Sequence, residues 1–150
     1  MYQSPRFYIV AFVAVLSAGL LQYSLFASIG GPAANAILAV LLVLALLTDS
    51  AGYYLLLVAE GVALFTFFPG FDRSSFALAA VALAVFAMKH YFLWRSALNT
   101  LIAIALGTAV FYAAADARFL IQAPVIVAQE AVYNCGIGLL VYWSLQRFIS

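Results

Sequence analysis

Charged residues are scarce in this chain of 150 residues: Lys, Arg, Asp and Glu together make up 7% of it, and the formal net charge is +1. So few basic residues leave no surface that would bind nucleic acid. Hydrophobic residues make up 69% of the chain, far above the proportion in soluble domains. The composition therefore predicts an integral membrane protein whose partners lie in or beside the bilayer.

Cysteine and histidine each occur once, as Cys135 and His90. A disulfide needs a second cysteine and a zinc site needs several such ligands, so we expect neither, and we expect no cofactor. The sequence shows no pattern typical of a nucleophilic triad, a glycine-rich phosphate loop or an HExxH metal site. A catalytic acid would have to be Glu60 or Glu130, both inside apolar segments. We therefore predict that the protein is not an enzyme.

The apolar runs are continuous, whereas the strands of a membrane β-barrel alternate apolar with polar residues. Most runs approach the roughly 20 residues that a helix needs to cross a bilayer. We therefore expect an all-α integral membrane protein, a single domain built as a bundle of six transmembrane helices. The expected spans cover about residues 7–28, 32–48, 52–69, 75–92, 97–114 and 124–146.

Two of these spans have alternatives. The second is the shortest, so it could instead enter and leave the membrane on one side. Arg6 before an apolar core and small residues is also the pattern of a cleaved signal peptide, which would remove the first span. We expect the hairpin from 52 to 84 to organise the bundle, because Glu60 lies near the middle of its first apolar run. Ser74 or Ser75 is expected to cap the second helix of this hairpin.

Basic residues in the short loops predict the orientation of the bundle. With six crossings, one side of the membrane carries four of them and the other side two: Arg6, Lys89, Arg95 and Arg147 against Arg73 and Arg118. Because basic loop residues stay in the cytoplasm, both termini are expected there. If the second segment did not cross, the count would be three against three, so the bias favours six crossings.

A few polar side chains lie within the apolar segments, where each must be paired or face a cavity. Glu60 and Glu130 are the ionisable ones, and Glu130 shares one helix face with Asn134, four residues later. We expect these residues, with Asn35, to form interhelical hydrogen bonds or to contact a partner protein. The alternative is that Glu60 or Glu130 carries a proton or binds a cation.

Three features together resemble the MreD family of bacterial cell-shape proteins: the overall plan of closely spaced helices, a central hairpin and the final helix. The resemblance rests on Pro32 to Asn35 at the start of the second span, on Gly61, Pro69-Gly70 and Lys89 in the hairpin, and on Glu130, Tyr133, Asn134, Tyr142 and Arg147 in the final helix.

This resemblance implies a non-enzymatic scaffold of the cell-wall elongation machinery, located as a multi-pass protein in the bacterial inner membrane. It implies binding to the transmembrane helix of an MreC-like protein, and a link to MreB filaments and a RodA-type synthase. A homo-oligomer is compatible with this role.

The MreD family is also similar in fold to the substrate-binding subunits of energy-coupling-factor vitamin transporters, which implies an alternative function. Ala14 and Ala18 form a small-xxx-small pattern that resembles the alanine motif with which those subunits dock on their membrane partner. Gly136 and Gly138 are expected to thin the last helix in a similar way. A small ion- or proton-coupled carrier that uses Glu60 is the third hypothesis.

Overall fold

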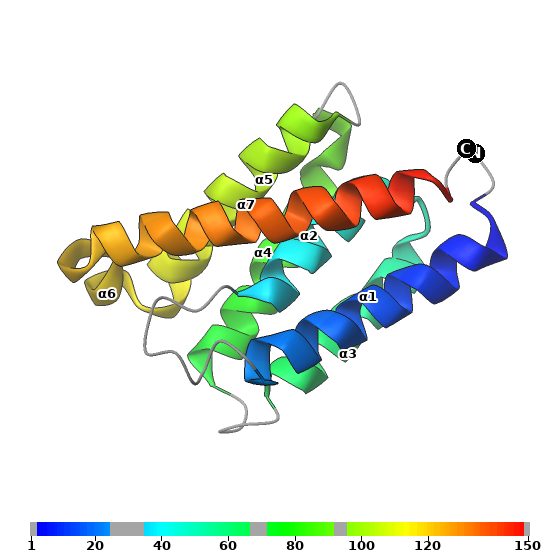
Figure 1. The fold of residues 1–150 in the computed structure, drawn as a ribbon. Helices are drawn as coiled ribbons and strands as arrows, with labels where there is room; N and C mark the ends of the chain where they lie inside the picture. Colours follow the sequence, from blue (N-terminus) through cyan, green and yellow to red (C-terminus); the bar gives the residue numbers. More distant parts are fainter. Residues whose placement is uncertain (1–2, 25–34, 67–71, 92–95, 149–150) are drawn as a thin grey trace.

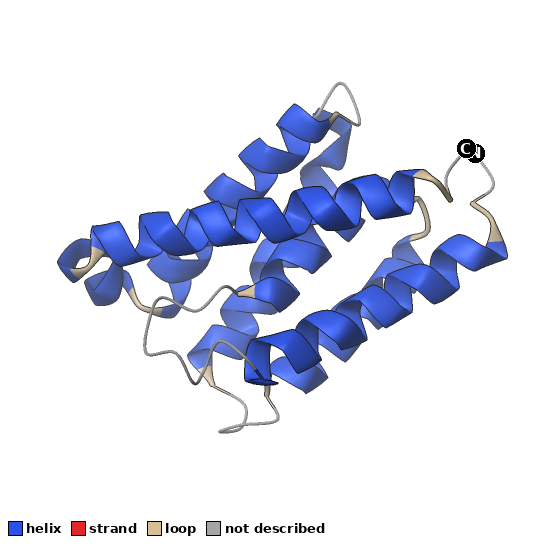
Figure 2. Ribbon diagram, in the orientation of Figure 1, coloured by secondary structure: helices blue, strands red, loops and turns tan. Residues whose placement is uncertain are grey.

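The computed structural model describes residues 3–24, 35–66, 72–91 and 96–148, and the secondary structure within these ranges is entirely helical (Figure 2). The expected all-helical fold is confirmed. The helices are α1 (Pro5–Ser24), α2 (Ala36–Leu47), α3 (Ala51–Phe65), α4 (Arg73–Met88) followed by the 3₁₀ helix η1 (Lys89–Tyr91), α5 (Ala97–Ala115), α6 (Ala117–Gln122) and α7 (Pro124–Gln146). The expected span ends at 25–28, 32–34, 67–69 and 92 lie outside the described residues.

Four helices are long and apolar enough to cross a membrane: α1, α4 together with η1, α5 and α7, each with 19 to 23 residues. α2 and α3 are shorter, with 12 and 15 residues. At about 1.5 Å per residue they extend about 18 and 22 Å, against a hydrocarbon core of about 30 Å. Length and composition therefore identify four candidate spans in the described part of the chain.

Two aspartates set helix starts that the sequence analysis did not place. Asp72 caps α4, because its Oδ1 accepts a hydrogen bond from the backbone N–H of Ser75 at 3.0 Å. The expected cap at Ser74 or Ser75 is therefore wrong, since an aspartate just before the helix satisfies its free N–H groups. Asp116 caps α6 in the same way, a short helix that the apolar pattern did not predict.

α2 is the central element of the bundle, and all 12 of its residues are buried. It packs against α1, α3, α4, α5 and α7, which surround it (Figure 1). This arrangement corrects the expectation that the hairpin from 52 to 84 organises the bundle. Because α2 carries only Ala, Ile, Leu and Val side chains, it can be buried on every side. A helix enclosed by protein also does not need to match the thickness of the lipid.

Glycines on three surrounding helices let those helices approach α2 closely. They contact three consecutive residues of α2: Gly61 of α3 contacts Leu41, Gly107 of α5 contacts Leu42, and Gly138 of α7 contacts Val43. A Cβ atom at Gly61 would lie 2.8 Å from Cδ1 of Leu41, and one at Gly107 would lie 2.5 Å from Cδ1 of Leu42. Consecutive helical residues point about 100° apart, so one level of α2 faces three neighbours.

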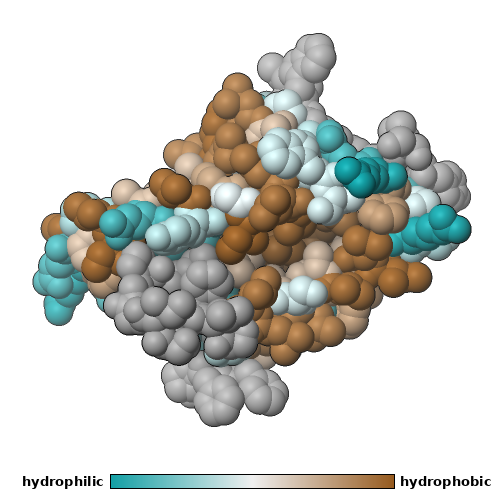
Figure 3. Space-filling model, in the orientation of Figure 1, coloured by the Kyte–Doolittle hydropathy of each residue, from teal (hydrophilic) through white to brown (hydrophobic). Residues whose placement is uncertain are grey.

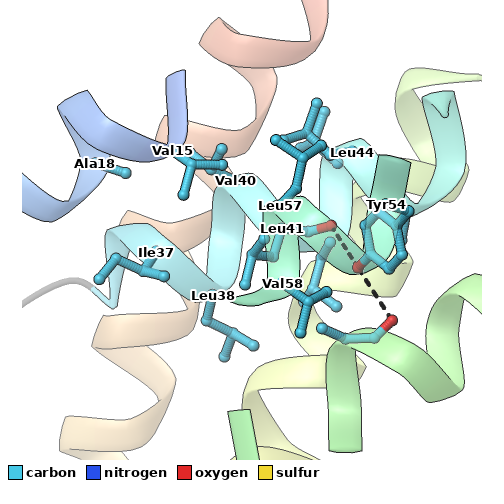
Figure 4. Packing of buried hydrophobic residues seen from close by; sticks show 14 of the residues in the cluster. Val15, Ala18, Ile37, Leu38, Val40, Leu41, Leu44, Tyr54, Leu57 and Val58 are labelled. Carbon is cyan, nitrogen blue, oxygen red and sulfur yellow. Dashed lines mark hydrogen bonds between the residues drawn. The ribbon is translucent and has the colours of Figure 1, made fainter. Parts of the chain in front are cut away.

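Tyr54 of α3 adds a polar contact to this apolar centre. Its buried hydroxyl lies 3.0 Å from the carbonyl oxygen of Leu41 and 3.1 Å from that of Ala82, so it can donate to either (Figure 4). Its ring stacks on Phe86 of α4, with the ring centroids 4.5 Å apart. One side chain therefore joins α3 to both α2 and α4.

One end of the bundle, the terminal end, brings together the start of α1 and the ends of α2, α4 and α7. The side-chain amide of Gln3 donates to the carbonyl oxygen of Leu47. The ammonium group of Lys89 donates to the carbonyl oxygen of Thr48 at 2.7 Å. The hydroxyl of Ser4 donates to the carbonyl oxygen of Phe148 at 3.2 Å, which places the two ends of the described chain side by side.

The opposite end, the distal end, brings together the ends of α1, α3 and α5. Oε1 of Gln22 accepts from the backbone N–H of Ile37 at 3.2 Å, and the hydroxyl of Tyr23 donates to the carbonyl oxygen of Phe65 at 2.8 Å. The ring centroids of Phe65 and Phe111 are 6.2 Å apart. α1, α3 and α5 therefore run in one direction, and α2, α4 and α7 run in the other (Figure 1).

The outer surface is apolar between two more polar ends. Only 28–33% of each long helix is buried inside the chain, so many of its apolar side chains face outward. In Figure 3, hydrophobic residues cover much of the middle of the visible face, and hydrophilic ones gather towards α6 and towards the terminal end. Water would make such a surface unfavourable, whereas the hydrocarbon of a bilayer solvates it. The surface therefore supports a membrane protein.

Candidate functional site

Glu130 is the most deeply buried acid in the described part of the chain, and 4% of it is exposed. Its carboxylate accepts a hydrogen bond from the hydroxyl of Tyr112 on α5 and another from the backbone N–H of Asn35. Asn35 caps α2, because its Oδ1 accepts from the backbone N–H of Leu38 at 3.1 Å. One acid at the distal end of α7 therefore connects α7 to α5 and to the start of α2.

Asn134, one turn further along α7, makes a second polar contact with α5. Its Nδ2 donates to Oγ1 of Thr108 at 3.1 Å, and both residues are 0% exposed. Its Oδ1 has no hydrogen-bond partner within the described ranges. Residues four apart on each helix align, so the pairs Tyr112–Glu130 and Thr108–Asn134 form two successive contacts. Such interhelical hydrogen bonds contribute about 0.6–2 kcal/mol each in a membrane.

Glu60 lies on α3 at its interface with α1. Seven residues earlier, the hydroxyl of Tyr53 donates to the carbonyl oxygen of Tyr8, and four residues later Leu64 lies against Gly19. Residues 53, 60 and 64 share one face of a helix, so Glu60 faces α1 between these two contacts. Both of its carboxylate oxygens are buried, and neither has a hydrogen-bond partner among residues 3–24, 35–66, 72–91 and 96–148.

A buried carboxylate without a partner costs several kcal/mol as an anion, so it is stable there only with a proton or with a partner group. The side chain of Glu60 as a whole is only half-buried, so part of it is exposed on the surface of α3. Of the two acids singled out in the sequence, Glu60 is the one whose carboxyl group has no hydrogen-bond partner among the described residues. No three His, Cys, Asp or Glu side chains of the described chain lie close enough together to hold a metal ion.

The small residues of α1 and α7 have different environments. Ala18 is 3% exposed and Ala14 is partly buried against the core, so Ala18 is occupied by packing inside the chain. Cys135 is half-buried, and its thiol lies 3.8 Å from the carbonyl oxygen of Leu101. At Gly136 a Cβ atom would meet nothing within 4 Å, whereas at Gly138 it would lie 2.1 Å from a side chain of α5.

The sequence analysis did not identify the partners of Glu130 and Asn134. Tyr112 lies near the end of an apolar span, where tyrosine is common at the membrane boundary, and Thr108 lies well inside the span. The sequence does contain a signal for this pairing: Thr108 and Tyr112 are four residues apart, and so are Glu130 and Asn134. Matching spacings on two neighbouring antiparallel helices could have paired them.

The polar network shows how the helices are joined, and Glu60 shows where a further contact could form. Comparison of the chain with protein-family models, with curated proteins and with solved structures finds no match. The resemblance to the MreD family therefore rests on the sequence patterns described above.

Proposed function

We propose that this chain is a six-span membrane scaffold with both termini in the cytoplasm, and that it acts by binding the transmembrane helices of partner proteins. The alternating directions of α1, α2, α3, α4, α5 and α7 support six crossings. α2 is short, yet its start contacts Gln22 near the end of α1, and its end contacts Gln3 near the start of α1. These contacts join both ends of α2 to the two ends of α1, a helix of membrane-spanning length, and so support a crossing by α2.

The distribution of basic residues supports the orientation. Arg6, Lys89 and Arg147 lie at the terminal end, and Arg73 and Arg118 follow helices that end at the distal end. Arg95 lies outside the described residues and follows η1 in the sequence. An excess of basic residues at the terminal end favours a cytoplasmic location for that end.

The unpaired carboxyl group of Glu60 is the observation that carries the scaffold proposal. The other buried acid, Glu130, is fully used in joining three helices of this chain. Glu60 adds nothing comparable to the fold, since no described group bonds to its carboxyl oxygens. An acid retained in a membrane at a cost of roughly 2.5–3.5 kcal/mol is most simply explained by a contact made outside the chain. A transmembrane helix with a basic or hydrogen-bonding side chain would supply that contact.

The resemblance to the MreD family names the partner that we propose, an MreC-like protein of the cell-wall elongation machinery. The test is co-purification of the chain with an MreC-like protein in detergent. Glu60→Leu should abolish co-purification and leave the melting temperature unchanged or raised, because it removes an unpaired acid. Glu130→Leu serves as the contrast, since it should lower the melting temperature. Undiminished binding of the MreC-like protein by folded Glu60→Leu would overturn the role of Glu60.

A second candidate function, an ion- or proton-coupled carrier, is favoured by the same carboxyl group, because a buried acid without a partner can hold a proton. Glu60→Gln separates the two functions. A carrier should lose transport with this variant, whereas a scaffold keeps a hydrogen-bonding group at residue 60 and retains part of its partner binding. Tight, stoichiometric binding of thiamin, riboflavin or biotin would instead favour a vitamin-binding subunit.

A further inference from the structure

A hollow of about 440 Å³ at the terminal end is lined by residues from both ends of the described chain. Its lining residues are Ser4, Pro5, Arg6, Arg147 and Phe148. The hydrogen bond from the hydroxyl of Ser4 to the carbonyl oxygen of Phe148 holds its two sides together. The scaffold function proposed above does not use this hollow.

The chemistry of the hollow favours an anion. Arg6 and Arg147 are both exposed, and no acidic side chain of the described chain lines the hollow. The positive end of the α1 helix dipole lies there as well, because α1 begins at Pro5. The negative end of the α7 dipole lies at the same end of the bundle and opposes that of α1, so the positive charge of the hollow comes from the two arginines.

Two arginines that line the same hollow as apolar side chains fit one class of ligand particularly well. Guanidinium groups bind phosphate oxygens through paired N–H donors, and they do so more specifically than an ammonium group. In the orientation proposed above, on which this step rests, the terminal end would meet the phosphate level of the bilayer, next to the hydrophobic surface seen in Figure 3. Pro5 and Phe148 provide an apolar surface for the carbon atoms next to a phosphate.

We propose that the hollow between Arg6 and Arg147 is a binding site for a phosphate group, supplied by an anionic phospholipid or by a soluble phosphate. Each arginine near an anionic membrane surface contributes about fivefold to binding. Loss of both should therefore weaken binding by about twenty-fivefold. The site joins the first and last helices, so an occupied site would also hold the two ends of the chain together.

The experiment uses the full chain in detergent and measures binding of dioleoyl phosphatidylglycerol, dioleoyl phosphatidylcholine and inorganic phosphate by native mass spectrometry and by thermal shift. Arg6→Gln with Arg147→Gln removes the site. Arg73→Gln with Arg118→Gln is the matched control, since it removes the same charge at the distal end. Arg6→Lys with Arg147→Lys keeps the charge and removes the paired donors. All of these arginines are exposed, so each double variant should fold.

We expect phosphatidylglycerol to bind better than phosphatidylcholine, and we expect the terminal-end glutamine variant alone to lose this preference. Partial loss in the lysine variant would support paired guanidinium donors. If inorganic phosphate binds with the same dependence on the two arginines and displaces the lipid, the site is supported and its ligand is soluble. Equal binding by the wild type and both glutamine variants would overturn the proposal. The proposal would also be overturned if neither phosphatidylglycerol nor inorganic phosphate bound. An acidic protein segment would then be the ligand to consider.

Discussion

Gly138 provides a sensitive test of how closely α7 packs against the rest of the bundle. A Cβ atom at residue 138 would lie 2.1 Å from Cδ1 of Ile104, and 3.4 Å from Cγ2 of Val43 in α2. Ile104 is 0% exposed, so its terminal methyl group has little space into which to move. Extra volume in a packed core costs about 1–3 kcal/mol. Replacing a helical glycine by alanine otherwise stabilises by about 0.5–1 kcal/mol.

Gly136 lies two residues earlier on the same helix and is the matched control, because a Cβ atom there would meet nothing within 4 Å. Gly136→Ala should be neutral or slightly stabilising, and Gly138→Ala should be less stable than it by about 1–3 kcal/mol. The measurement is the free energy of unfolding in mixed micelles titrated with denaturing detergent, followed by circular dichroism. Equal stability of the two variants would refute the close contact between α7 and α5.

A second substitution tests the atom responsible. Ile104→Val removes Cδ1, the atom nearest to the added methyl group, and alone should cost about 0.5–1.5 kcal/mol. In combination with Gly138→Ala the total cost should be clearly smaller than the sum of the two single effects, because the clash is gone. Additive effects would place the strain of Gly138→Ala somewhere other than at Ile104.

Two further predictions concern polar contacts. Tyr112→Phe removes a hydrogen bond to buried Glu130 and should lower the free energy of unfolding by about 1–2 kcal/mol. Tyr133→Phe is the control, because Tyr133 lies on the exposed side of α7, and it should leave the free energy of unfolding unchanged. Equal effects of the two substitutions would contradict the contact between Tyr112 and Glu130. Hydrogen bonds from the backbone N–H and hydroxyl of Ser75 hold the pKa of the Asp72 carboxyl below its usual value. This cap should therefore stabilise fully above about pH 4 and fail as the pH falls through the lower folded pKa. The measurement is the free energy of unfolding as a function of pH. Asp72→Asn should keep the cap and lose this acid dependence, and Asp72→Ala should cost about 1 kcal/mol at neutral pH. An unchanged acid dependence in Asp72→Asn would contradict the role of the Asp72 carboxyl group.

The helical fold was predictable because continuous apolar runs leave a membrane protein few alternatives. Pro124 and the end of α7 at residue 146 agree with the expected last span, because a proline and a charged end mark these limits directly in the sequence. The position of α2 was not predictable. An all-apolar helix is equally suited to lipid and to a protein interior, so its sequence does not say which one surrounds it.

The candidate site was predictable only in part. The sequence identifies Glu60, Glu130 and Asn134, because polar groups stand out in an apolar segment. It does not say which of them finds a partner, since Tyr112 lies 18 residues from Glu130 and only the packing of α5 on α7 brings them together. Gly136 and Gly138 look alike in the sequence, and only the position of Ile104 distinguishes them.

The most direct test of the six-span arrangement is the labelling of single cysteines by a membrane-impermeant reagent in intact and in opened cells. Cys135 is first replaced by alanine, and single cysteines are then placed at exposed residues of the terminal end, Ala51 and His90, and of the distal end, Arg73 and Gln122. The arrangement predicts that Arg73 and Gln122 are labelled from outside, and that Ala51 and His90 are labelled only after the cells are opened. Labelling of Ala51 from outside would contradict the account, since either α2 would not cross or the bundle would have the opposite orientation.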